Sequence, residues 1–306
     1  VEFTGCAKSC GVGRSFKPYK NRVDEWDEML DQVLVTKAAA GIEPLPPTVS
    51  RLASAMGRED YGLREIEQII AYDPVLTGRL LRIANSAALS TGAPIASVRA
   101  AILKIGAGRV LSYALSGPLS KQMQRPIAGY GLGQGVLWRH LVASALAVEM
   151  LDGTTKVRVP SEAFAAALLH DLGQVVMAQF LDAKIMRLIE LAKEQGLTSR
   201  EAELEILGVH QGEVGALVAQ EWRLPDRIVR AIAYAGTTVN GEDVLYDFVH
   251  LGHVLAGRIG EYAGMPDKEL EILPEVAERV GLLPESVDPL LEKIEERLGE
   301  VLRLYS

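Results

Sequence analysis

Apolar residues recur at spacings of three and four along most of this chain, which is the periodicity of amphipathic α-helices. No convincing run of alternating apolar and polar residues, the pattern of a half-buried strand, interrupts it. Helix boundaries are marked by Pro47 in a first turn, by Asp73 as an N-cap before Pro74, and by Gly106 as a stop. The pattern predicts an all-α fold.

A glycine-rich stretch, "RPIAGYGLGQG", divides the predicted helices into two groups. Its alternating glycines invite comparison with a phosphate-binding loop, but such loops follow a strand and none is predicted here. We therefore expect a flexible connector and a two-lobed multi-helix bundle. The predicted limits are an irregular leader at 1–24, a helical lobe at 25–125, the connector at 126–135, a second helical lobe at 136–260 and a helical extension at 261–306.

The second lobe and the extension show the clearest amphipathic patterns. In the extension, one apolar stripe contains Leu291, Ile294, Leu298 and Leu302. We expect this stripe to dock on the protein's own core, with a homodimer through the C-terminal helix as the alternative. The helices predicted in the second lobe span residues 136–151, 161–179, 182–195, 199–207, 210–221, 225–235 and 242–262.

Composition and charge narrow the classes of partner. Apolar residues make up 48% of the chain and charged residues 24%, which is typical of a globular protein. The formal net charge of −8 argues against nucleic acid and anionic membranes as main partners. The hairpin around Gly106 resembles a helix-turn-helix, but its second helix offers Arg109 and little else for reading bases, so an ordinary hairpin is predicted.

The N-terminal residues and the overall hydropathy point to a cytoplasmic protein. No apolar run reaches the roughly 18 residues needed to span a bilayer, and the leader lacks the apolar core of a signal peptide. Cys6 and Cys10 lie in this leader without a nearby histidine, and free thiols are expected there rather than a zinc site.

The histidines indicate candidate chemistry, because all five follow residue 139. Imidazoles combined with a carboxylate suit iron, manganese, zinc or nickel, and such an ion lowers the pKa of a bound water. "LLHDLGQ" places His170 beside Asp171. Neighbouring side chains on a helix diverge by about 100°, so the pair can share an ion only if it lies close over the helix between them. The alternative is a structural pair, in which Asp171 orients an imidazole by a hydrogen bond.

Several motifs resemble a known family. "WRHLVASALAVEM" and "AALLHDLGQVV" are similar to the core of the HD-type metal-dependent phosphohydrolases. "LPPTVSRLASAM", "IIAYDPVLTGRLLRIANSA", "IASVRAAILKIGAGRV" and "HQGEVGALVAQEWRLPDRIVRAI" resemble the related HDOD domain, over roughly residues 35–260. The resemblance implies one or two divalent transition metals (Fe, Mn, Zn or Ni). The implied ligands are His140, His170, Asp171 and His253, with His210 as a weaker candidate.

Three departures from the HD-type pattern weaken the case for catalysis. Gln174 follows Gly173 where that pattern has a lysine, Ala235 and Gly236 replace a pair of histidines after "RAIAY", and no Gly-Tyr-Pro motif follows. The HD-type pattern also has a carboxylate ligand in the stretch that corresponds to "FVHLGHVLA". This chain has His253 there and no aspartate. The resemblance therefore implies a non-catalytic module of bacterial signalling that binds regulatory or signalling proteins. The alternative is a metal-dependent phosphohydrolase acting on a nucleotide or a cyclic dinucleotide.

Overall fold

The structure is a computed structural model that describes most of the chain after residue 44. Within the described residues it is helical, with a single isolated β-bridge and no strand, so the predicted all-α fold is confirmed. The predicted leader, with Cys6 and Cys10, and most of the helix expected at 182–195 lie outside the described residues. The described residues are 45–58, 61–86, 94–180, 187, 190–192, 194–207, 209–235, 243–261 and 270–302.

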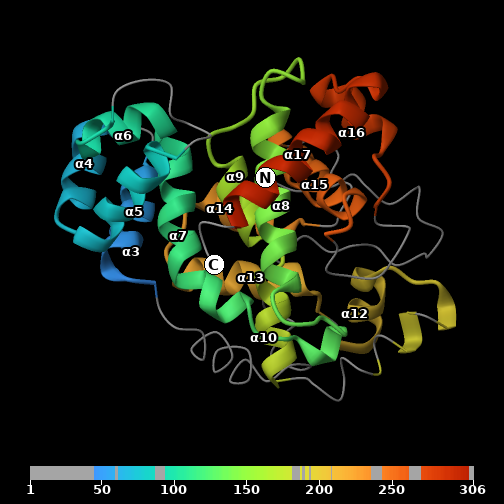
Figure 1. Cartoon of the computed structure of the whole chain (residues 1–306). Helices are drawn as coiled ribbons and strands as arrows, with labels where there is room; N and C mark the ends of the chain where they lie inside the picture. The colour runs from blue at the N-terminus through green and yellow to red at the C-terminus, as the bar shows by residue number, and fades with distance from the viewer. Residues whose placement is uncertain are drawn as a thin grey trace.

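Five helices form the first part of the structure, and the local sequence explains where they begin and end. The Asp73 carboxylate accepts a hydrogen bond from the backbone N–H of Leu76 at 2.9 Å, as an N-cap should. Gly106, with φ +92°, stops one helix before the next begins. The helices are α3 (Pro47–Met56), α4 (Leu63–Ala71), α5 (Pro74–Ala84), α6 (Val98–Ile105) and α7 (Ala107–Met123). Figure 1 shows α3, α4, α5 and α6 grouped at one side of the molecule, which is compatible with a first lobe.

The glycine-rich stretch forms a closed turn between α7 and the next long helix. Ile127 and Leu132 exchange two backbone hydrogen bonds of 2.9 and 3.1 Å around the short 3₁₀ helix η2 (Ala128–Tyr130). Gly131 and Gly135 adopt positive φ angles of 68° and 75°, which glycine tolerates without strain. The turn directs the Tyr130 side chain toward the second group of helices, where its hydroxyl donates to Glu203 on α12 (Ser199–Leu207).

The second group of helices surrounds α8, which is buried along most of its length. It packs against α9 (Ala163–Leu169), α15 (Val244–Arg258) and α17 (Val287–Leu302). The observed bounds of α8, α12 and α13 lie within a residue of those predicted. The helix predicted over 161–179 is wrong as a single element, because it breaks into two helices at His170 and Asp171. The helices are α8 (Val136–Leu151), α9 (Ala163–Leu169), α10 (Leu172–Phe180), α12 (Ser199–Leu207), α13 (Gln211–Glu221), α14 (Asp226–Ala233) and α15 (Val244–Arg258).

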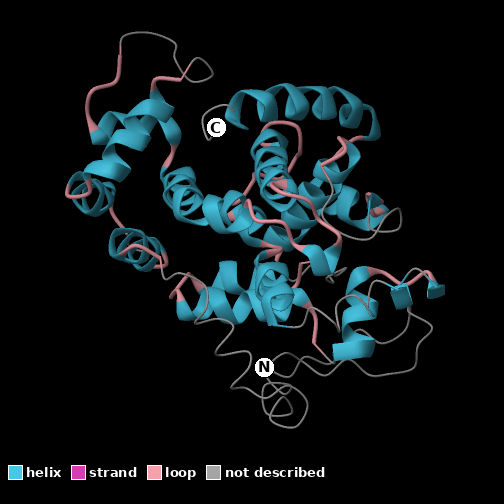
Figure 2. Cartoon of the chain, turned by 60° about the horizontal axis from the view of Figure 1, so that its bottom comes forward, coloured by secondary structure: helices cyan, strands magenta, loops and turns pink. Residues whose placement is uncertain are grey.

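The C-terminal extension contains α16 (Pro274–Val280), η4 (Pro284–Ser286) and α17 (Val287–Leu302). The α17 helix packs on α8, and Figure 2 shows it beside the C mark, lying across the other helices. The expected docking on the protein's own core is therefore what the structure has, and a homodimer through the other face of α17 stays a prediction. No helix in the described part of the chain has the length and hydropathy to cross a membrane. The residues of α17 that are buried are Val287, Leu290, Ile294, Leu298 and Val301.

An ion-pair cluster ties the beginning of α15 to α14. Arg227 holds the Asp243 carboxylate with two hydrogen bonds of 2.8 Å, and its third nitrogen lies 3.1 Å from Glu162. Asp243 also caps α15 by accepting from the N–H of Leu245 at 2.9 Å. The Arg227 guanidinium outweighs burial and lowers the pKa of Asp243 below its usual value.

Replacing Asp243 with alanine is expected to lower the free energy of unfolding by about 1–2 kcal/mol at neutral pH, the sum of one N-cap and one partly exposed ion pair. Because the folded-state pKa is lowered, the contribution is complete above the unfolded pKa of about 3.9 and is lost as pH falls through the folded value. Urea unfolding of both proteins from pH 7 to 3 measures this. Asp243→Asn keeps the cap and should lose only the ion-pair part. A difference that persists unchanged at pH 3 would contradict the assignment.

Candidate metal centre

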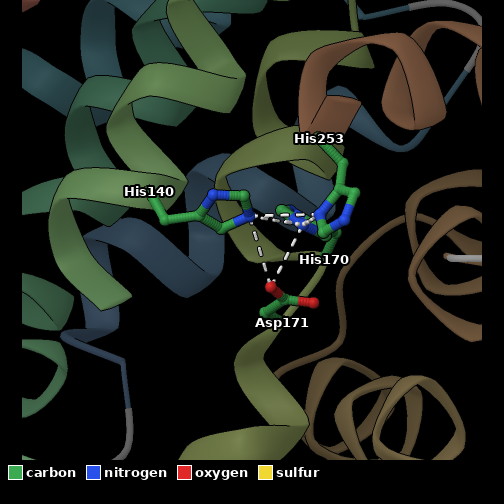
Figure 3. Close-up of side chains that lie close together, drawn as sticks. All are labelled: His140, His170, Asp171 and His253. Atoms are coloured by element: carbon green, nitrogen blue, oxygen red, sulfur yellow. Dashed lines mark hydrogen bonds and ion pairs between the residues drawn. The ribbon is translucent and has the colours of Figure 1, made fainter. Parts of the chain in front are cut away.

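Four polar side chains meet in the interior where three segments of the chain approach each other. His140 comes from α8, His170 and Asp171 from the break between α9 and α10, and His253 from α15 (Figure 3). One nitrogen or oxygen from each residue lies within 4.8 Å of all the others. His140, His170 and Asp171 are 0%, 2% and 2% exposed, and His253 is half-buried. The structure thus brings together the four residues that the sequence indicated.

The break between α9 and α10 allows two neighbouring residues to contribute to one point. In a continuous helix their side chains would diverge by about 100°. Here His170 ends α9 and Asp171 lies in the turn before α10, and the His170 Nε2 atom is 3.2 Å from Asp171 Oδ2. After the break, α10 packs closely on α13 at Gly173.

The distances between the ligand atoms match the space around one ion. His140 Nε2 and His170 Nε2 are 3.2 Å apart, and His253 Nδ1 lies 3.1 Å from the first and 3.0 Å from the second. Asp171 Oδ2 lies 3.4 Å from His140 Nε2. Four ligands at about 2.1 Å around a tetrahedral ion are separated by about 3.4 Å, so small outward movements would admit the metal.

Backbone carbonyls fix the orientation of two of the three imidazoles. His140 Nδ1 lies 2.7 Å from the Glu261 oxygen, and His170 Nδ1 lies 2.7 Å from the Ala167 oxygen. A carbonyl can only accept, so both Nδ1 atoms carry a proton and the Nε2 atoms of the neutral rings present lone pairs. Two lone pairs 3.2 Å apart repel each other unless a proton or a metal ion lies between them. A carbonyl behind the imidazole is also the usual support of a metal-bound histidine.

The charges around the cluster favour a bound cation. Burial alone would raise the pKa of Asp171, but the imidazoles of His170 and His140 outweigh it and hold that pKa well below its usual value. Burial and the two neighbouring imidazoles lower the pKa of His253 well below its usual value. Burial opposes protonation of His170, yet Asp171 and the Ala167 carbonyl raise its pKa. The carboxylate is thus ionised and His253 neutral, the states that ligate metals, while His170 exchanges a proton for the ion.

One weaker candidate from the sequence, His210, and two further polar residues do not belong to the four-residue cluster. His210 lies outside the cluster, because its ring accepts a hydrogen bond from the Gly212 N–H and forms a capping box with Glu213 at the start of α13. Asp247, six residues before His253, forms a two-bond ion pair with Arg279. Gln174, where a lysine is expected in hydrolases, is buried with 4% exposure.

Three residues on the side of Asp171 away from the imidazoles were not predicted from the sequence: Gln211, which bonds Asp171, and Glu203 and Tyr130, which follow it in a chain of hydrogen bonds. Gln211 Nε2 donates to Asp171 Oδ1 at 2.7 Å, and the Gln211 backbone N–H donates to Glu203 Oε2 at 2.7 Å. The Tyr130 hydroxyl donates to the other oxygen of Glu203 at 2.7 Å. One signal was available, because Glu203 lies one helical turn before Leu207, on the apolar face of its helix.

Comparison with known proteins places this arrangement in context. Residues 42–237 match the family model of the HDOD domain. An uncharacterized protein from Treponema pallidum (strain Nichols) is 23% identical over 211 residues, which make up 66% of this chain and 40% of that protein. This chain therefore spans about two fifths of the length of that relative.

Solved structures share the fold at low sequence identity. An HDOD domain protein of unknown function from Geobacter sulfurreducens has a TM-score of 0.61 and 23% identity, covering 86% of this chain and 97% of its own. A candidate signal transduction protein from Marinobacter aquaeolei VT8 has a TM-score of 0.68 and 19% identity, covering 90% and 64%. A candidate phosphohydrolase from Shewanella amazonensis SB2B has a TM-score of 0.61 and 20% identity, covering 89% and 96%. At these identities the similarity establishes the fold alone.

Proposed function

Because this chain belongs to the HDOD domain family, we propose that it is a non-catalytic regulatory module that holds one divalent transition metal and binds signalling proteins. The convergence of three ring nitrogens and one carboxylate oxygen on a single buried point carries the metal part of this proposal. Three nitrogens and one oxygen suit zinc, iron, manganese or nickel. The ion would connect α8, the α9–α10 break and α15, and would replace the proton of His170.

The enclosure of the cluster supports a structural rather than a hydrolytic metal. A catalytic ion keeps one position open for water and substrate, whereas a structural ion is surrounded by four protein ligands. Here four protein atoms are available, and three of the four side chains are almost fully buried. The neutral side chain of Gln174 also cannot provide the cation that a phosphate substrate would need. Membership of the HDOD family supports a role in signalling through protein partners, as does the name of one structural relative, a candidate signal transduction protein.

Metal analysis of His170→Ala tests the proposal. The protein is prepared without a metal-affinity column, and its metal content is measured by elemental analysis. We expect close to one transition-metal ion per wild-type chain and almost none in the variant, because the alanine removes one of four ligands from the centre of the cluster. His210→Ala is the matched control, since it removes a buried histidine that caps α13, and it should keep the ion. Equal metal content in wild type and His170→Ala would contradict a site at these residues.

One observation favours a hydrolase as the second candidate. His253 is half-buried, so one side of the cluster reaches toward solvent, where a water and a phosphate oxygen could approach a bound ion. Incubation of the metal-loaded protein with a cyclic dinucleotide and with nucleoside triphosphates distinguishes the two functions. We expect no turnover. Metal-dependent turnover that His170→Ala abolishes would overturn the non-catalytic part of the proposal and leave the metal site standing.

A further inference from the structure

A second buried carboxylate lies behind the cluster, at Glu203 on α12, with 1% exposure. Both of its oxygens accept hydrogen bonds of 2.7 Å, Oε1 from the Tyr130 hydroxyl and Oε2 from the Gln211 backbone N–H. Two accepted bonds are the pattern of an ionised carboxylate. Keeping an anion in the interior is costly unless a nearby positive charge or strong donors compensate it. The two donors stabilise the Glu203 carboxylate in the interior.

A short chain of hydrogen bonds connects Glu203 to the cluster. Gln211 is the first residue of α13, and it contacts both carboxylates: its backbone N–H bonds Glu203, while its side-chain amide bonds Asp171 Oδ1 at 2.7 Å. The amide holds one oxygen of Asp171, so that the other oxygen, Oδ2, faces the imidazoles of His140 and His170. The position of Asp171 thus depends on residues from α12, α13 and the turn at Tyr130.

The charge of the four ligands gives Glu203 a function. Three neutral imidazoles and one carboxylate provide one negative charge, so a divalent ion leaves one positive charge uncompensated in the interior. We propose that Glu203 supplies the second negative charge and, through Gln211, acts as a positioning residue for the metal site. This inference rests on the proposed metal binding.

The Tyr130 hydroxyl is held in its protonated form, in which it can donate to Glu203. Burial first, and then the Glu203 carboxylate, raise the pKa of Tyr130 well above its usual value. The phenol therefore stays protonated and donates its hydrogen bond to the carboxylate at any pH at which the protein is studied.

Three variants separate charge from hydrogen bonding. Glu203→Gln removes the charge with almost no change of shape, since an amide can accept from the Gln211 N–H and donate to the Tyr130 oxygen. Tyr130→Phe keeps the charge and removes one hydrogen bond. Glu205→Gln removes a charge from an exposed position on the same helix. Zn²⁺ affinity is measured by competition with a chromophoric chelator, and the visible spectrum of the Co²⁺-loaded protein reports the ligand geometry.

We expect Glu203→Gln to weaken Zn²⁺ binding by about 10-fold or more, the usual effect of losing a residue that supports metal ligands. Tyr130→Phe should weaken Zn²⁺ binding less than Glu203→Gln does, and Glu205→Gln should bind Zn²⁺ like wild type. The Co²⁺ spectrum of Glu203→Gln should keep the wild-type band positions. An unchanged affinity in Glu203→Gln would overturn the inference, even if that variant melts at a lower temperature, because Glu203 would then be purely structural. A wild-type protein that binds no Zn²⁺ would overturn the proposed function itself, and this inference with it.

Discussion

Replacing Gly173 with alanine is expected to lower the free energy of unfolding by more than about 3 kcal/mol, beyond the usual cost of overpacking. A Cβ atom at this position would lie 1.8 Å from the Gln211 carbonyl oxygen and 2.9 Å from the Gly215 backbone nitrogen. Both contacts are with backbone, so no side-chain rotation can relieve them, and α10 and α13 must move apart. Because Gln211 also holds Asp171, the same change should weaken metal binding. Chemical unfolding and the metal assay measure the two effects.

A glycine in an open place provides the control for Gly173→Ala. Gly78 lies within α5, and a Cβ atom there would meet nothing within 4 Å. Gly78→Ala is expected to leave stability unchanged or raise it by up to about 1 kcal/mol, since alanine favours the helix and restricts the unfolded chain. If Gly173→Ala were as stable as Gly78→Ala, the close packing of α10 on α13 would be incorrect.

Removing the metal is expected to lower the melting temperature by about 4 °C or more. A ligand that binds only the folded state stabilises it by about 2.7 kcal/mol when its concentration is 100 times Kd, and each kcal/mol shifts the melting of a chain of this size by about 1.5–2 °C. The proposed ion would join α8, the α9–α10 break and α15, because its four ligands come from these three segments. Thermal unfolding before and after chelation, and after Zn²⁺ is restored, measures the shift.

His170→Ala is the control for the chelation experiment, because it should melt at the same temperature with and without chelator. A wild-type protein that loses its metal without any change in melting temperature would show that the ion does not stabilise the folded state. The structural part of the proposed function would then fail, whatever the metal content of the protein.

The sequence alone predicted helices best where their ends carry local signals. Asp73 before Pro74 and the glycine at 106 mark ends that the structure confirms. It failed at His170 and Asp171, because the residues on both sides of this pair are apolar and continue a helical pattern without a cap. The break coincides with a tertiary contact, the approach of Gly173 to the backbone of Gln211, which lies 38 positions later.

The candidate site was predictable mainly through the family resemblance. The match of "WRHLVASALAVEM", "AALLHDLGQVV" and "FVHLGHVLA" to the HD-type pattern implied the four residues that the structure brings together. Glu203, Gln211 and Tyr130 were missed, because their importance arises from contacts between the turn, α12 and α13 that no local pattern encodes. On the apolar stripe of α17, Ile294 and Leu298 were correct, while Leu291 and Leu302 lie at its edge and Leu290 and Val301 are buried instead.

The way α15 and α17 cover α8 decides how this protein should be divided for experiments. The match to the family model ends at residue 237, before α15 begins, yet α15 contributes His253 and packs along α8, and α17 covers another side of α8. A fragment trimmed to the matched residues would lose one of four ligands and expose the apolar surface of its central helix. If such a fragment precipitated or bound no metal, the cause would be the loss of α15 and α17 and not a property of the whole chain. The shortest useful fragment extends through residue 302.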